Sequence, residues 1–245
     1  MDTDQVILID KPAGMTSFGV VARVRRKLSE QTGHKVRVGH TGTLDPFATG
    51  LMIILTGKMT KKSGDFLKLD KVYEATIHLG ATSTTGDQEG EITPCKPTSS
   101  TVIPGRSASP SLRVSSLKTR RNSDLPKTTV DKVLRSFIGE ITQTPPIYSA
   151  IRINGQRAYK LARKGEKVDM PTRKVRIYSI ELLDYNYPEL KIRAHVSSGT
   201  YIRTLAQDIG EKLGTGAYLA RLRRIQIGDY NISQAKVLAD FCINN

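Results

Sequence analysis

The chain has no tryptophan, only two cysteines and only four histidines, and these shortages exclude several classes of protein. Two cysteines, Cys95 and Cys242, cannot build a disulfide framework, so a reducing cytoplasm is the expected location. No cysteines and histidines have the spacing of metal ligands, and no metal site is expected. A P-loop and a dinucleotide-binding glycine fingerprint are also missing, so the expected chemistry uses a carboxylate and no cofactor.

Long apolar runs and acidic residues are scarce as well. The apolar run at residues 51–55 has the length of a strand, and residues 6–9 are too short for a signal-peptide core, so no membrane segment is expected. There are 23 Asp and Glu against 38 Lys and Arg, which gives a net charge of +15. Such a surplus attracts a polyanion, for which nucleic acid is the first candidate and an anionic membrane surface the second.

The hydrophobic periodicity predicts an α+β fold with a mixed, mainly antiparallel central sheet flanked by helices. Residues 6–9, 51–55, 73–79 and 190–197 have strand patterns, and the last two alternate apolar with polar side chains. Ser17 is the expected N-cap of a helix over residues 18–30. Residues 200–213 have helical spacing, with Gly214 as the expected C-cap. We expect one domain over residues 1–245.

One segment, residues 96–127, shows no apolar periodicity. It contains eight serines, four prolines and seven Lys or Arg, against the single acid Asp124. A segment of this composition cannot bury enough apolar surface to fold by itself. The sequence therefore predicts a basic, disordered insertion.

The most informative stretch is residues 39–50, GHTGTLDPFATG, which lies between apolar strand-like runs. Its glycines allow the backbone to approach a ligand closely, and Pro46 keeps Asp45 out of helical geometry. Threonine hydroxyls and free backbone N–H groups could orient the carboxylate. By composition alone, a tight connecting turn in which Asp45 caps its neighbours explains the stretch equally well.

This stretch resembles the catalytic motif of the TruB-type tRNA pseudouridine synthases. Five more blocks of the sequence resemble motifs of that family, and they occur in the same order. These blocks are residues 10–17 (DKPAGMTS), 71–80 (KVYEATIHLG), 145–163 (PPIYSA, then Gly155, Tyr159 and AR), 198–206 (SGTYIRTLA) and 222–224 (LRR). The resemblance implies the pseudouridine synthase fold and an enzyme that isomerises the T-loop uridine of transfer RNA. That reaction flips the base out of the loop, breaks its glycosidic bond and rejoins it through carbon.

The resemblance assigns the catalysis to three residues. Asp45 matches the family's essential aspartate; attack on the sugar, addition to the base and removal of a sugar proton all stay open as its role. Arg203 matches the arginine that pairs with this aspartate, although its helical position opposite Leu205 by itself predicts a solvated face. Tyr73 matches a tyrosine that stacks on the target base, although a place in the core explains its alternation.

A second group of residues is expected to bind the substrate. His40 would fill the space that the flipped base leaves, although a histidine without a role explains this loop position nearly as well. Tyr201 and Leu222 match pocket-lining positions, which plain packing also explains. The set is completed by Gly42 and Thr43 in the loop and by Lys11, which with Pro12 is expected to support the active-site loop rather than react.

The expected partner is the T-loop and stem of transfer RNA, gripped by a thumb-like segment at residues 142–172. No guide RNA, membrane or metal is expected, and the protein is expected to be a monomer. The sequence stops about twenty residues after Arg224, so the family's C-terminal PUA-type RNA-binding domain is expected to be missing. A non-catalytic RNA-binding protein, and an enzyme for another target such as messenger RNA stem-loops, remain the alternatives.

Overall fold

The computed structural model describes residues 3–95, 125–149, 151–153, 155–166 and 168–243. Strands and helices alternate irregularly along these residues. Their bounds are β1 Val6–Lys11, α1 Ser17–Thr32, β2 Val38–His40, β3 Thr49–Thr56, the 3₁₀ helix η1 Gly57–Lys62, α2 Ser63–Lys68, β4 Lys71–Leu79, β5 Ala81–Ser83, β6 Ile92–Pro94, α3 Lys127–Arg135, β7 Gly139–Gln143, β8 Arg152–Ile153, β9 Gln156–Arg157, α4 Ala158–Arg163, β10 Arg173–Asn186, β11 Glu189–Val196, α5 Ile202–Leu213, β12 Ala217–Ile227, β13 Tyr230–Asn231, the 3₁₀ helix η3 Ile232–Gln234, β14 Lys236–Val237 and α6 Leu238–Ile243.

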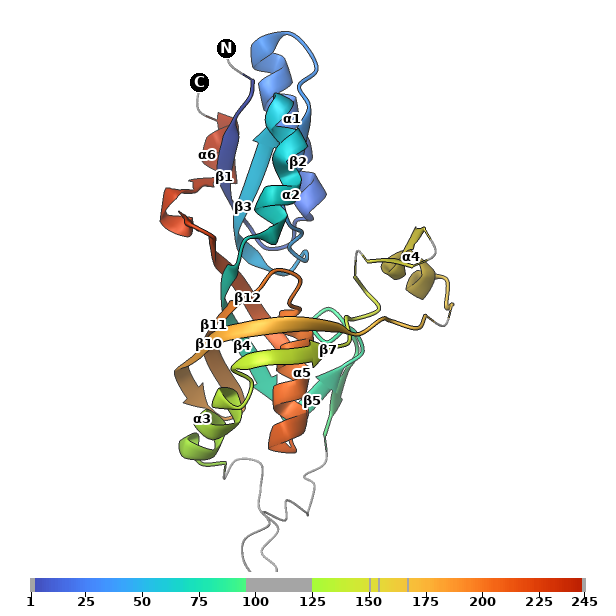
Figure 1. Cartoon of the computed structure of the whole chain (residues 1–245), viewed down its shortest axis with the longest axis vertical. Helices are drawn as coiled ribbons and strands as arrows, with labels where there is room; N and C mark the ends of the chain where they lie inside the picture. The colour runs from blue at the N-terminus through green and yellow to red at the C-terminus, as the bar shows by residue number, and fades with distance from the viewer. Residues whose placement is uncertain (1–2, 96–124, 150, 154, 167, 244–245) are drawn as a thin grey trace, which may run out of the picture.

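One large sheet runs through the molecule (Figure 1). Its strand order is β14-β1-β3-β12-β4-β11-β10-β7, with β2 added beside β3 and β13 beside β12. Only β1–β14 and β3–β12 pair in parallel among the described strands, so the sheet is mixed and mainly antiparallel, as predicted. The long strand β12 also pairs with β4 and thereby joins the half that carries α1 to the half that carries α5.

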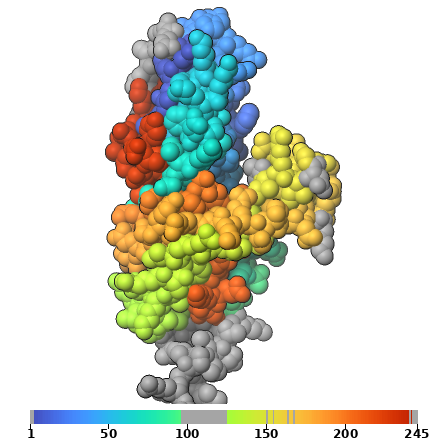
Figure 2. Space-filling model, in the orientation of Figure 1, coloured from blue at the N-terminus to red at the C-terminus, as the bar shows by residue number. Residues whose placement is uncertain are grey.

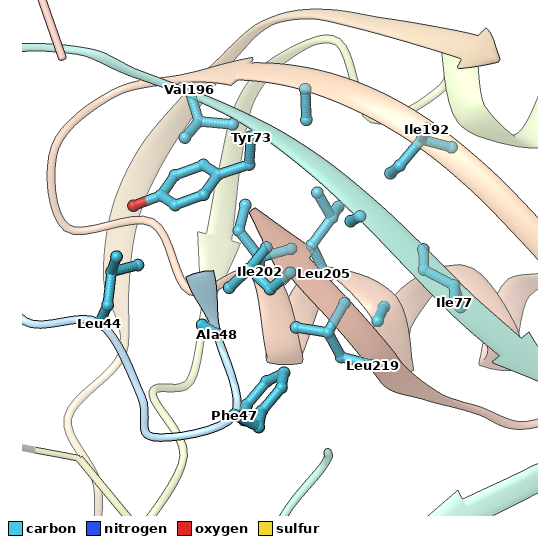
Figure 3. Packing of buried hydrophobic residues seen from close by; sticks show 14 of the residues in the cluster. Leu44, Phe47, Ala48, Tyr73, Ile77, Ile192, Val196, Ile202, Leu205 and Leu219 are labelled. Carbon is cyan, nitrogen blue, oxygen red and sulfur yellow. The ribbon is translucent and has the colours of Figure 1, made fainter. Parts of the chain in front are cut away.

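The main core lies between this sheet and the helices α1, α3 and α5. Strand β4 alternates buried with half-buried residues, and its buried side includes Tyr73 and Ile77. Leu205 and Ile209 of α5 are fully buried in the same cluster, together with Leu219 of β12. Figure 3 shows Leu205 and Leu219 within it. The alternate residues of β4 and the apolar residues of α5 therefore pack together in one layer of the core.

Strand β3 is buried on both of its faces. Met52 and Ile54 belong to the main core, whereas Leu51, Ile53 and Leu55 form a second cluster. Partly buried residues of η1, α2 and the segments around them pack on that second cluster. A continuous apolar run, rather than an alternating one, is the pattern of a strand covered on both sides.

Helix α1 begins at Ser17, one residue before the predicted start, and its cap differs from the prediction. The N-cap is Thr16, whose hydroxyl accepts a hydrogen bond from the N–H of Gly19 at 3.0 Å. Ser17 was the expected cap and is wrong in that role, because its side chain is turned inward and bonds the backbone of Leu44. One hydroxyl thus stabilises the helix, while its neighbour holds the loop that follows β2.

The two special segments of the sequence have different outcomes. Residues 96–124 of the expected insertion lie outside the described residues, and Lys127 already begins α3. Within residues 142–172, strands β8 and β9 form a small sheet of their own and lead into α4. This unit projects sideways from the body of the molecule (Figure 2). No helix among the described residues is both long enough and apolar enough to cross a membrane.

We expect Leu205→Ala to lower the free energy of unfolding by about 2–5 kcal/mol, because it opens a cavity in the main core. Urea unfolding followed by circular dichroism measures the change. Glu211→Ala, at an exposed position of the same helix, is the control and should stay within about 0.5 kcal/mol of wild type. Equal effects of the two substitutions would contradict the placement of α5 against the sheet.

Candidate active site

The loop between β2 and β3 carries Asp45, and buried groups fix it from two sides. Lys11 is fully buried, and its ammonium donates to the carbonyls of Met15 at 2.6 Å and of Pro46 at 3.0 Å. Ser17 Oγ donates to the carbonyl of Leu44 and accepts from its N–H, both at 2.8 Å. The residues directly before and after Asp45 are therefore both anchored.

Arg224 of β12 closes the third side of this loop. Its guanidinium is buried and donates to the carbonyls of Leu51 at 2.8 Å and of Gly42 at 3.2 Å. Gly50 has a φ of +107°, and a Cβ there would overlap the backbone of Arg224. Glycine is therefore required where the end of the motif crosses β12.

Asp45 forms an ion pair with Arg203, which is 158 positions away in the sequence. Arg203 Nε lies 3.0 Å from Asp45 Oδ2, and Nη2 lies 3.5 Å from Oδ1. The Arg203 side chain is 5% exposed, whereas that of Asp45 is 33% exposed. The prediction of a solvated arginine from helical periodicity is therefore wrong, and the carboxylate keeps one side open to a ligand.

Arg203 also contacts three other groups. Its Nη1 lies 3.4 Å from Asp87 Oδ2 and donates to the carbonyl of Thr85 at 3.0 Å. Its Nη2 donates to the carbonyl of Tyr148 at 2.8 Å. Asp87 is held in turn, because its Oδ1 accepts from the Thr85 hydroxyl at 2.5 Å and from the N–H of Glu89 at 3.0 Å. A planar guanidinium with five donors can serve all these acceptors at once.

The charges around Asp45 oppose one another. Burial raises the pKa of the Asp45 carboxyl above its usual value, although Arg203 and Lys11 favour the ionised form. Burial, Asp87 and Asp45 raise the pKa of Glu89 in the same way. Burial lowers the pKa of Lys11 to about 8. Desolvation is thus the largest effect on each of these groups, as in many catalytic sites.

Two cavities flank Asp45 and Arg203, and both residues line both cavities. The smaller cavity has a volume of about 280 Å³. Besides the pair, it is lined by five predicted residues, which are Gly42, Thr43, Tyr73, Tyr201 and Leu222, and by Arg224, which was not predicted. The larger, of about 690 Å³, lies between the start of α1 and the projecting unit and includes His40, Phe18, Arg157 and Tyr159. The structure therefore gathers most of the predicted set around one carboxylate.

Two predicted residues need separate mention. His40 accepts a hydrogen bond at Nδ1 from the N–H of Gly42 at 3.3 Å, and burial together with the charges of Arg224 and Arg157 lowers its pKa. The imidazole is thus favoured in its neutral form. Lys11 lines neither cavity, and its bonds to the carbonyls of Met15 and Pro46 are those of the loop support that we expect from the sequence.

The predictions from sequence missed Asp87, Arg224 in its buried role, and the pairing of Gln143 with Tyr201. Gln143 donates to the Tyr201 carbonyl at 3.3 Å and accepts from its N–H at 3.0 Å, which fixes the start of α5. An acid directly after Gly86, in a stretch rich in hydroxyl residues, was the available signal for Asp87. No local pattern marks a lysine or arginine as buried, because both are usually exposed.

The Asp45–Arg203 pair between two cavities makes this a candidate enzyme site, and comparison with known families specifies its class. The family described as TruB family pseudouridylate synthase (N terminal domain) matches residues 25–108 and 106–202. The tRNA pseudouridylate synthase B C-terminal domain matches residues 203–242. The chain therefore belongs to the TruB family of pseudouridylate synthases. The boundary between the two matches falls within α5, and β12 of the second match pairs with β3 and β4 of the first.

Curated relatives agree with this assignment. A tRNA pseudouridine synthase B from Phocaeicola vulgatus is 42% identical over 97% of this chain and 91% of its own length. The protein of the same name from Aquifex aeolicus is 42% identical over 97% of this chain and 73% of its own length.

Solved structures show the same fold. The Cbf5-Nop10-Gar1 complex contains a chain with a TM-score of 0.65 and 27% identity, which matches 96% of this chain. An H/ACA RNP bound to a substrate RNA containing 2'-deoxyuridine gives a TM-score of 0.62 at 25% identity over 96% of this chain. This chain spans about half of those two chains, 52% and 51%. The expected pseudouridine synthase fold is thereby confirmed.

We expect Arg203→Met to lower the free energy of unfolding by about 3–5 kcal/mol, because it leaves the buried carboxylate of Asp87 without its cation. Urea unfolding measures the loss. The control is Arg221→Met, at an exposed position of β12, where a change within about 0.5 kcal/mol is expected. A destabilisation no greater than that of the control would show that Arg203 is not a structural partner of Asp87.

Proposed function

We propose that this chain isomerises the T-loop uridine of transfer RNA to pseudouridine, with Asp45 as the catalytic carboxylate. The observation that carries the proposal is the Asp45–Arg203 ion pair at 3.0 Å between two cavities. The relatives that match nearly the whole chain are named for transfer RNA, which supports this substrate. Because they match at 42% identity, against 25–27% for the chains from H/ACA complexes, we propose an enzyme that acts without a guide RNA.

The reaction is an internal exchange of bonds. The bond between N1 of uracil and C1′ of the ribose breaks, and a bond between C5 and C1′ forms. C5 loses its proton and N1 gains one, so no oxidant or reductant is needed. Attack on the sugar, addition to the base and removal of a sugar proton each require an ionised, fixed carboxylate. Arg203 holds Asp45 in place, and the open side of Asp45 faces the substrate.

The smaller cavity is the proposed place of the flipped uracil. Tyr73 and Leu222 both line it, and a base between them would lie on an aromatic ring next to Asp45. The Tyr73 hydroxyl points toward the loop that carries Leu44 and Asp45 (Figure 3). Arg203 also lines this cavity, and its donors are taken by four acceptor groups, which hold its side chain in place.

The larger cavity and the projecting unit are the proposed place of the rest of the RNA loop. Arg152, Arg157 and Lys160 are exposed on that unit, and Arg157 also lines the cavity. Basic side chains supply affinity for phosphates, while the shape of a folded loop supplies specificity. Residues 142–172 would then act as the thumb that the sequence predicts.

We expect Asp45→Asn to lower the rate of pseudouridine formation by about 10³-fold or more, because the amide is neither nucleophile nor base. Release of tritium from C5-labelled transfer RNA transcripts measures the rate. The Kd for the same transcript should stay equal or become tighter, since a negative charge is removed. A transcript with cytidine in place of the T-loop uridine is the control and should release no tritium.

Two results would contradict the proposal. Retained activity in Asp45→Asn would remove Asp45 from the catalysis. A wild-type protein that binds transfer RNA but releases no tritium from it would support either the non-catalytic alternative or another RNA target. Mapping pseudouridines in all cellular RNA with and without the protein then separates those two.

The rate should also fall at acid pH, because the carboxyl of Asp45 must be ionised. Burial raises its pKa above that of an ordinary aspartate, near 3.9, so the fall should begin at a higher pH than such a residue dictates. The charge of Asp87 contributes to this rise, and Asp87→Asn is therefore expected to move the acid limb to lower pH. Single-turnover rates against pH measure it, with circular dichroism at each pH as the control for folding. If the acid limb of the pH–rate profile lies at the same pH in Asp87→Asn as in wild type, the coupling between Asp87 and Asp45 is contradicted.

A further inference from the structure

One buried hydroxyl at the site, that of Ser149, forms no hydrogen bond within the described residues. Ser149 is 6% exposed, and its Oγ is the one buried side-chain oxygen that lacks a hydrogen-bond partner in the part of the chain that the structure describes. Burying a hydroxyl without a partner costs free energy, and most buried polar atoms are paired. An alanine at this position would not have that cost. The presence of a hydroxyl here therefore suggests that it forms a hydrogen bond with a bound ligand.

Ser149 occupies the boundary between the two cavities. It lines the larger one with His40 and Tyr159, and the smaller one with Tyr73 and Leu222. Asp45 and Arg203 line both cavities as well. The hydroxyl is therefore on the path of any nucleotide that reaches from one cavity into the other.

The backbone around Ser149 is held in place on both sides. The carbonyl of the preceding residue, Tyr148, accepts from Arg203 Nη2 at 2.8 Å. The carbonyl of Ser149 itself accepts from the N–H of Tyr159 at 3.1 Å. Ser149 is thus tied to the catalytic ion pair through Arg203 and to α4 through Tyr159. A hydroxyl on a fixed backbone loses little freedom when it binds.

We propose that the Ser149 hydroxyl hydrogen-bonds the ribose–phosphate of the target nucleotide, which makes it a substrate-binding residue of this site. The inference rests on the proposed function. With the uracil in the smaller cavity and the adjoining RNA in the larger one, the sugar lies at their boundary beside Asp45. A hydroxyl both donates and accepts, so it suits a phosphate oxygen or a ribose 2′-hydroxyl.

The test is Ser149→Ala with a transfer RNA transcript. We expect kcat/KM for tritium release to fall about 5- to 20-fold, which corresponds to one lost hydrogen bond. The thermal midpoint of the free protein should be unchanged or higher, because the substitution removes an unpaired buried hydroxyl. Loss of activity without loss of stability is the signature that a structural serine would not give.

Thr215→Val is the matched control at a buried hydroxyl that does have a partner. Thr215 is 2% exposed, and its Oγ1 donates to the carbonyl of Gly216 at 2.9 Å. We expect this variant to lose thermal stability and to keep the wild-type kcat/KM below its midpoint. The two hydroxyl deletions should therefore have opposite signatures.

Binding separates the two possible atoms on the nucleotide. In an Asp45→Asn background, which blocks turnover, Ser149→Ala is compared with its parent on transcripts that carry either uridine or 2′-deoxyuridine at the target. If the 2′-hydroxyl is the partner, the two proteins bind the deoxy transcript equally. If a phosphate oxygen is the partner, Ser149→Ala binds both transcripts more weakly than its parent.

The inference is overturned if Ser149→Ala keeps the wild-type kcat/KM, or if its thermal midpoint falls as that of Thr215→Val does. Both results require that the wild-type protein releases tritium in the same assay. A wild-type protein that binds the transcript without releasing tritium refutes the proposed function instead, so the two failures are distinguishable.

Discussion

The site depends on one guanidinium. Arg203 reaches the Asp45 carboxylate, the Asp87 carboxylate and the carbonyls of Thr85 and Tyr148, and these belong to three segments outside its own helix. A cation buried to 5% exposure is stable only because acceptors surround it. The same contacts that satisfy Arg203 therefore fix the loop that carries Asp45, the turn after β5 and the segment around Tyr148 relative to each other.

Desolvation and pairing act against each other at this point, and both serve the chemistry. Burial makes the ionised form of Asp45 less favourable, while Arg203 and Lys11 make it more favourable. Water in the site would weaken the pair and also solvate the carboxylate. In the proposed reaction, a nucleotide bound at the open side of Asp45 would displace the remaining water and strengthen the electrostatic interactions of the pair.

Much of the fold could be predicted because the hydrophobic residues of its strands and helices follow a regular spacing. Strand β4 alternates over its whole length, and the spacing of α5 ends at Gly214 in the left-handed conformation. The choice between Thr16 and Ser17 as the cap of α1 could not be predicted, because both are good caps and only the distant Leu44 distinguishes them.

The motifs carried most of the predicted site, whereas the contacts that hold the site together could not be predicted from them. Helical periodicity predicts a solvated face for Arg203, because the periodicity depends only on which nearby residues are apolar. It contains no information on Asp45, a carboxylate that is distant in the sequence. Lys11 and Arg224 are buried against backbone carbonyls, a role that no local pattern reveals. Asp87 and Ser149 lie in irregular segments, so their importance arises only from what the fold brings beside them.

The long sequence separation between Asp45 and Arg203 has a consequence for protein synthesis. A ribosome adds residues from the N-terminus, so the arginine is added 158 positions after the aspartate. Until α5 emerges and β12 inserts between β3 and β4, the aspartate has no cation opposite it and the central pairing of the sheet is missing. A nascent chain with an excess of basic residues can attract RNA electrostatically, yet the Asp45–Arg203 pair can form only after α5 has been synthesised.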